Sequence, residues 1–169
     1  MKKVKIILII LIGIFLVGCS ENDIIEEVIP EEPTEELLSS PDVSLHVGDL
    51  TINGTLDRYC WEEGGTTCSL EPTSPKERLK EERPLRVNPE VKVNIIIGTS
   101  DPLLFPIELL TPDNIELIQT NKDEKTTIEV ENKQFTAPKE EGDYYYSAIF
   151  TWDGDQKGQA IYAFSLWVK

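Results

Sequence analysis

The sequence predicts an all-β protein: an antiparallel, immunoglobulin-like sandwich with one short helix, preceded by a signal peptide and a disordered acidic tether. Short segments with strand patterns recur between turn-rich stretches from residue 43 onward, and a single segment carries the start signals of a helix. Roughly 125 residues follow the tether, which is enough to bury one hydrophobic core. We therefore expect a signal peptide at 1–18, a tether at 19–42 and one β-sandwich domain at 43–169.

The first expected strands are recognised by alternation and by β-branched composition. Residues 43–47 alternate apolar and polar side chains, and residues 50–56 do so again after a Gly-Asp turn. Residues 91–97 are rich in valine and isoleucine, and shorter segments of the same kind lie at 115–118 and 126–130. Each pattern is typical of a half-buried strand.

One segment has the start signals of a helix. Ser74 is suited to cap the N-terminus, Pro75 to occupy the first turn, and Glu77 to complete a capping box. The sequence therefore predicts one short helix at about 75–81.

The C-terminal region carries the strongest pair of strands. By period two, one face of each strand is apolar, with aromatic rings predominating on the first. These two faces consist of Tyr144, Tyr146, Ala148, Phe150 and Trp152, and of Ala160, Tyr162, Phe164, Leu166 and Val168. We expect the aromatic row to form the sandwich core, with a carbohydrate platform as the alternative.

The stretch between these strands, residues 153–158, contains Asp153 and Asp155. A calcium loop is one interpretation of the two carboxylates, but the EF-hand spacing and its terminal glutamate are missing. We expect a turn here, with cation binding as the alternative.

The N-terminus has the pattern of an export signal. Three lysines lie within the first five residues, and an apolar run follows at 6–17. Leu16, Val17 and Gly18 then precede Cys19, the arrangement of a lipoprotein cleavage site. We expect the mature chain to begin at a lipidated Cys19 on the extracytoplasmic face of the cell membrane. The alternatives are a soluble secreted form and a transmembrane anchor, for which a run of about a dozen residues is short against roughly 20.

Acidic residues and prolines are interleaved after Cys19. Between residues 20 and 41 the chain has eight acidic residues and three prolines, a composition that keeps a chain extended and unpacked. The apolar residues Ile24, Ile25, Val28 and Ile29 leave open a short amphipathic or partner-docking segment instead.

Two cysteines remain once Cys19 carries the lipid. Outside the cytoplasm, Cys60 and Cys68 are expected to form a structural disulfide that closes a hairpin around Gly64 and Gly65. A redox site is less favoured because the spacing is not C-x-x-C. No metal site and no cofactor are expected, since the single histidine, His46, leaves too few zinc ligands.

The net charge of the chain limits the classes of partner that it is expected to bind. The chain has 31 acidic and 16 basic residues, a net charge of −15, so nucleic acid is not an expected partner. Anionic headgroups also repel such a domain, which leaves the lipid as its means of membrane attachment.

Three classes of function follow from these features. The leading hypothesis is a non-enzymatic protein whose sandwich binds a protein or a cell-wall component. The second is an inhibitor of an extracellular protease, acting through residues 101–106, where prolines flank Leu103, Leu104 and Phe105; a plain crossover between sheets is the simpler interpretation of this stretch. Trp61, beside Cys60, is a further contact candidate, although packing against the disulfide is the more common role.

An enzyme is the least favoured class. The chain has neither G-x-S-x-G nor H-E-x-x-H, and only His46 could serve in a histidine-dependent triad. Paired carboxylates acting on glycosidic bonds are the remaining possibility.

Several segments also resemble a known group of proteins. Residues 54–61 (GTLDRYCW), Cys68, and the stretches 75–79 and 84–93 are similar to small surface lipoproteins of low-GC Gram-positive bacteria. The final segment, residues 142–164, is similar to the closing hairpin of bacterial immunoglobulin-like domains, including an intracellular proteinase-inhibitor family. The resemblance implies a fold and a location, and it supplies no catalytic or ligand-binding residues.

Overall fold

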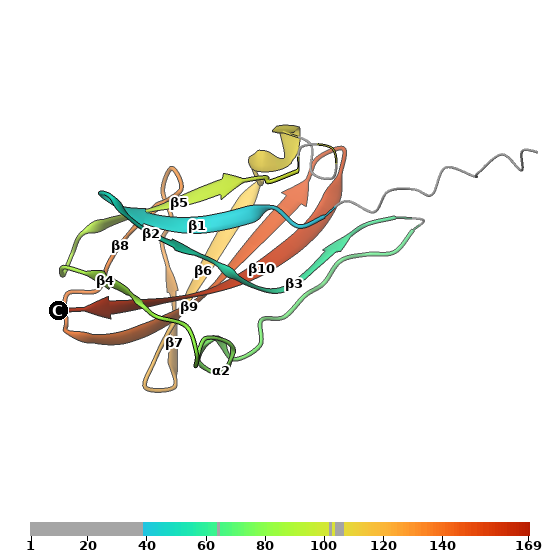
Figure 1. Ribbon diagram of the computed structural model, residues 1–169. Helices are drawn as coiled ribbons and strands as arrows, with labels where there is room; N and C mark the ends of the chain where they lie inside the picture. The colour runs from blue at the N-terminus through green and yellow to red at the C-terminus, as the bar shows by residue number, and fades with distance from the viewer. Residues whose placement is uncertain (1–38, 64, 102, 104–106) are drawn as a thin grey trace, which may run out of the picture. The chain divides into compact units, whose positions relative to one another are not determined.

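The computed structural model describes residues 39–63, 65–101, 103 and 107–169 (Figure 1). The expected signal peptide at 1–18, the lipidation at Cys19 and the tether up to residue 38 lie outside the described residues.

The described chain forms two β-sheets that pack face to face, as the sequence predicts for a sandwich. The four-stranded sheet has the order β2 (Leu50–Asn53), β1 (Asp42–Val47), β5 (Lys92–Gly98), β8 (Gln134–Thr136). The six-stranded sheet has the order β3 (Thr55–Trp61), β10 (Lys157–Val168), β9 (Gly142–Asp153), β6 (Asn114–Asn121), β7 (Glu124–Ile128), and β4 (Leu85–Val87) pairs with the end of β10. All pairs are antiparallel except β4 with β10.

Aromatic side chains of the six-stranded sheet fill the core. All ten side chains that the sequence assigns to one face of β9 and β10 are buried. Phe135 on β8 meets Tyr146 on β9 with ring centroids 5.3 Å apart, a contact between the two sheets. The prediction of a core is confirmed, and the carbohydrate platform is excluded for this row because its rings face the opposite sheet.

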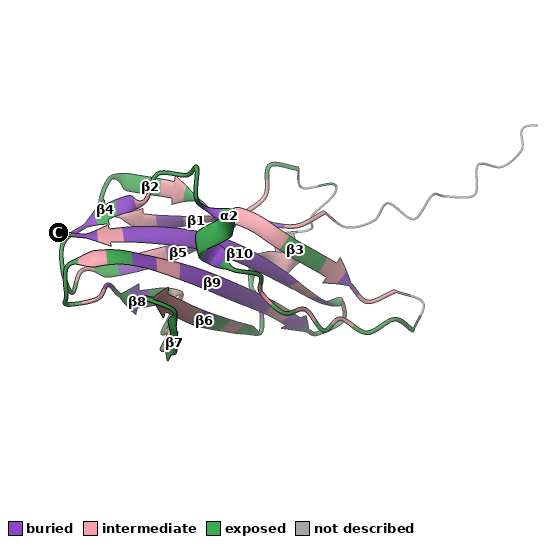
Figure 2. Ribbon diagram, turned by 90° about the horizontal axis from the view of Figure 1, so that it is seen from below, coloured by how far each residue is buried: buried purple, intermediate pink, exposed green. Residues whose placement is uncertain are grey.

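The other face of β9 and β10 is also buried along its middle, under the short helix α2 (Pro75–Arg78) (Figure 2). Leu79 on the covering segment is buried, as are Ile149, Ile161 and Ala163 on the strands. Ser74 caps the helix as predicted, accepting a hydrogen bond from the Glu77 N–H at 3.4 Å. The helix ends at Arg78, shorter than the predicted 75–81, because the backbone of the buried Leu79 leaves helical geometry, with φ −103° and ψ 11°.

One predicted strand is two strands in the structure. Residues 50–56 are expected to be continuous, yet the chain changes sheets at Gly54, so that β2 and β3 belong to different layers (Figure 1). A Cβ at Gly54 would lie 2.7 Å from the Phe164 ring, so the chain can cross this ring only at a glycine. The three-residue strands β4 and β8 were not expected from the pattern.

Candidate functional site

Two side chains of the sandwich hold the first described residues by hydrogen bonds to main-chain carbonyls. The indole N–H of Trp61 donates to the carbonyl of Ser39 at 3.0 Å, and the hydroxyl of Tyr162 donates to the carbonyl of Pro41. Burial raises the pKa of Tyr162 to about 12, with the nearby Asp42 carboxylate acting in the same direction against a hydrogen bond with Ser40. The hydroxyl is therefore a stable donor at neutral pH, and the start of the domain is held at two points.

Trp61 is part of this packed end. Its side chain is only 9% exposed, and its ring centroid lies 5.1 Å from that of Trp152. The indole N–H of Trp152 in turn donates to the carbonyl of Leu109 at 2.7 Å. Of the two roles considered for Trp61, packing agrees with this burial, whereas a surface contact does not. The position opposite it on β10 is Gly158, where a Cβ would lie 2.2 Å from the Trp61 ring.

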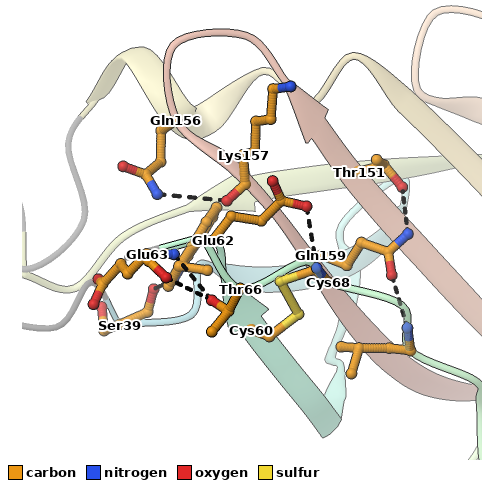
Figure 3. Close-up of a disulfide and its surroundings, with 12 residues drawn as sticks. Ser39, Cys60, Glu62, Glu63, Thr66, Cys68, Thr151, Gln156, Lys157 and Gln159 are labelled. Atoms are coloured by element: carbon orange, nitrogen blue, oxygen red, sulfur yellow. Dashed lines mark hydrogen bonds between the residues drawn. A yellow bond between two sulfur atoms is a disulfide. The ribbon is translucent and has the colours of Figure 1, made fainter.

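A disulfide joins Cys60 at the end of β3 to Cys68, with the two Cα atoms 5.9 Å apart (Figure 3). In the described part of the intervening loop, the Thr66 hydroxyl donates to the Glu63 carbonyl at 2.7 Å. The expected hairpin is wrong in one respect, because no strand lies between Cys68 and α2. The returning chain is instead joined to β10 by a side chain, since the Leu70 N–H donates to the Gln159 side-chain carbonyl at 2.9 Å.

Asp57, a residue that the sequence analysis missed, attaches the edge strand β3 to the segment before α2. The pairing of β3 with β10 shifts register at this position, which leaves Asp57 as the extra residue of a β-bulge. Its carboxylate is 5% exposed and accepts hydrogen bonds from the N–H and hydroxyl of Thr73 at 2.8 and 2.9 Å. Arg78 lies 3.7 Å from the same carboxylate and donates to the carbonyls of Leu56 and Asp57. No pattern in the sequence signalled this role, since Asp57 directly follows the stretch that was predicted as a strand, residues 50–56.

The stretch expected to contact a protease is described only in part. Leu103 is 85% exposed, whereas Leu104 and Phe105 lie outside the described residues. The Leu103 N–H donates to the Asp101 carboxylate at 3.0 Å, and the Asp101 N–H donates to the Thr99 hydroxyl at 3.1 Å. The short 3-10 helix η1 (Ile107–Leu110) follows and is fixed through its Leu109 carbonyl to Trp152. Leu103 thus stands on a stretch whose described flanks are both hydrogen-bonded.

An open groove of about 660 Å³ lies beside the start of β1 and the end of β5. Its lining is mixed: Val43, Leu56, Ile96 and Tyr162 supply apolar surface, and serine, asparagine and aspartate residues supply polar groups. Ile96 is 44% exposed there.

The remaining candidates give no metal centre. Asp153 ends β9, and Asp155 lies exposed in the turn to β10; the Asp153 N–H donates to the Asp113 carboxylate at 2.7 Å. His46 on β1 makes a hydrogen bond with Ser44 at 2.9 Å. Across residues 39–63, 65–101, 103 and 107–169, no three His, Cys, Asp or Glu side chains gather as metal ligands would.

Comparison with known proteins gives no match: no family model matches the chain, and no curated protein or solved structure is significantly similar to it. Within the part of the chain that the structure describes, no helix has the length and hydropathy needed to cross a membrane.

Proposed function

We propose that this chain is a lipid-anchored protein of the extracytoplasmic face of the cell membrane, similar to small surface lipoproteins, with an immunoglobulin-like sandwich that binds a protein or envelope component. The lysines before the apolar run at 6–17, and the Leu16-Val17-Gly18-Cys19 sequence after it, support the anchor. A compact domain that starts at a doubly hydrogen-bonded segment is suited to presentation on a tether.

The anchor is tested by the intact mass of the protein extracted from membranes, compared with a Cys19→Ala variant. A diacylglycerol-sized increment at the new N-terminus, absent from the variant, is the expected result. Equal membrane retention of the variant, with no lipid increment in the parent, would overturn the anchor without affecting the fold.

The single observation that carries the binding proposal is the exposure of Leu103, at 85%, on a stretch with hydrogen-bonded flanks. A large apolar side chain held in water favours contact with a partner, because burial of a leucine contributes about 1.5–3 kcal/mol. The groove beside Ile96 begins at the same end of β5 and adds apolar surface.

A photo-crosslinking amino acid placed at Leu103 in intact cells tests this surface, with the exposed Thr51 on β2 as the matched control position. We expect a discrete crosslinked product from position 103 and none from position 51. Identical labelling patterns from both positions would contradict a specific surface at Leu103.

A second function, inhibition of an extracellular protease, is favoured by the hydrogen bonds at Asp101 and Leu109, because a contact residue between two fixed points loses less entropy when it binds. The expected result is slowed cleavage by one member of a panel of extracellular proteases, with at least tenfold weaker inhibition by a Leu103→Asp variant. Unchanged protease rates at high protein concentration would leave the binding function as the sole proposal.

A further inference from the structure

The strand β7 forms one edge of the six-stranded sheet. Among the described strands it pairs with β6 alone, and the residues from Glu124 to Thr127 are all exposed. An open edge of this kind presents main-chain donors and acceptors to any strand that approaches it.

The turn before β7 determines which backbone groups point outward. Lys122 and Asp123 both have positive φ, 48° and 69°, as in a two-residue type I′ turn between Asn121 and Glu124. The N–H of Glu124 therefore points back toward β6, as in other turns of this class. Because these directions alternate along an antiparallel strand, the N–H and C=O groups of Lys125 and Thr127 point away from the sheet.

Two copies of this edge have complementary charges when they pair in antiparallel orientation. If two copies pair antiparallel with Thr127 opposite Thr127, Lys125 of each copy lies opposite Glu129 of the other, the residue that directly follows β7, and Thr126 lies opposite Ile128. Over residues 124–129, pairing centred on Lys125 would instead place two lysines opposite each other, and pairing centred on Thr126 or Ile128 would place no acidic residue of this stretch opposite Lys125. Within this stretch, charge therefore favours the register centred on Thr127.

The two charged residues of this register make no ion pair with the residues that the structure describes. Lys125 and Glu129 are both exposed, and within the described ranges the ion pairs are those of Asp57 with Arg58 and Arg78. Pairing with a second copy would therefore break no ion pair among these residues.

We propose that two copies of this chain associate through their β7 edges, antiparallel about a two-fold axis at Thr127, so that their six-stranded sheets become continuous. The partner is a second copy because it supplies the matching charges at both ends of the pair. A contact of one strand pair is smaller than a standard interface, so the dimer is expected to be weak in dilute solution.

A cysteine on the two-fold axis tests the register directly. In the full-length chain, Thr127→Cys places two thiols on residues with Cα atoms about 5.5 Å apart, within the range of a disulfide. The matched control is Thr126→Cys, whose copies are offset by two positions in the proposed register and lie beyond disulfide reach. Under mild oxidation at high protein concentration, we expect at least fivefold more dimer on a non-reducing gel from Thr127→Cys.

Charge exchange in the Thr127→Cys background provides a second readout. Lys125→Glu and Glu129→Lys are each expected to lower the dimer yield at least threefold, because each places like charges opposite each other. Combining the two substitutions restores opposite charges and is expected to restore the yield. Near-ultraviolet circular dichroism checks that the exposed substitutions leave the fold intact. Equal yields from positions 126 and 127, or a double exchange that remains as low as the single variants, would overturn the proposal.

Discussion

A single added methyl group at Gly158 tests the packing at the start of the domain. In Gly158→Ala the new Cβ would lie 2.2 Å from one carbon of the Trp61 ring and 2.7 Å from the Cys60 carbonyl oxygen. Both distances are far below van der Waals contact, so either the Trp61 ring is displaced or β3 separates from β10.

The expected loss of stability is the sum of three contributions. Overpacking of a core site costs about 1–3 kcal/mol. Loss of the hydrogen bond from Trp61 to the Ser39 carbonyl adds about 1 kcal/mol, and loss of the ring contact with Trp152 adds about 1 kcal/mol. We therefore expect Gly158→Ala to lower the free energy of unfolding by about 3–5 kcal/mol.

Urea unfolding followed by circular dichroism measures this loss, with Gly154→Ala as the matched control. Gly154 lies in the adjacent turn with no atom within 4 Å of an added Cβ, and its substitution is expected to change stability by less than about 0.5 kcal/mol. In a Trp61→Leu background the contact with the Cys60 carbonyl oxygen remains, whereas the ring, its hydrogen bond and its contact with Trp152 are absent, so Gly158→Ala is expected to cost about 2 kcal/mol less than in the parent. The same cost in both backgrounds would refute the reasoning.

Three further perturbations have expected outcomes. Replacing Cys60 and Cys68 together by alanine is expected to lower stability by about 2–3 kcal/mol, because the unfolded chain regains the entropy of an open loop; equal urea midpoints with and without a reductant would contradict this. Asp57→Asn weakens the ion pairs with Arg78 and Arg58, while the amide oxygen still accepts a hydrogen bond from Thr73. The free energy of unfolding, measured in urea, is therefore expected to fall by about 1–2 kcal/mol. The exposed Asp155→Asn is the control and is expected to leave it unchanged. The pKa of Tyr162 is raised in the folded state from 10.0 to about 12, so its contribution is fully present below pH 10 and is lost as the pH rises toward 12. This loss is about 1.4 kcal/mol per pH unit, and urea unfolding at pH 9, 10 and 11 should show a shallower decline for Tyr162→Phe than for the parent.

Strand existence could be predicted from the sequence wherever the pattern was long or strictly alternating. β1, β5, β9 and β10 lie within one to three residues of the predicted segments, because each strand shows one apolar face to the same core. The short helix was predicted from Ser74 and Pro75, since capping is a local property of the chain.

Other features depend on contacts between residues far apart in the chain. The three residues of β4 form a strand because they meet the end of β10, and β8 forms because it meets β5. Neither segment is long enough for a period to be measured. The alternating pattern of the sequence continues through Gly54, although the chain changes sheets there. The pattern does not reveal this change because the ring that requires a glycine belongs to Phe164, more than a hundred residues later.

The candidate site divides in the same way. Cys60, Cys68 and the loop at 101–106 were predicted from residue types and spacing, and the structure contains the disulfide and exposes Leu103. The buried role of Trp61 and the attaching role of Asp57 were decided by their neighbours, Trp152 and Gly158 for the first and Thr73 and Arg78 for the second.

The sequence by itself determined the β class, the position of the longest strands, the pair of cysteines and the acidic character of the chain, because periodicity, composition and spacing are local quantities. Only the tertiary structure decided which sheet each strand joins, which aromatic rings meet across the two sheets, how the residues after Cys68 attach to the edge strand β3, and that β7 pairs with one strand only. Those outcomes depend on long-range contacts between side chains of different strands, and no single segment of the sequence specifies such a contact.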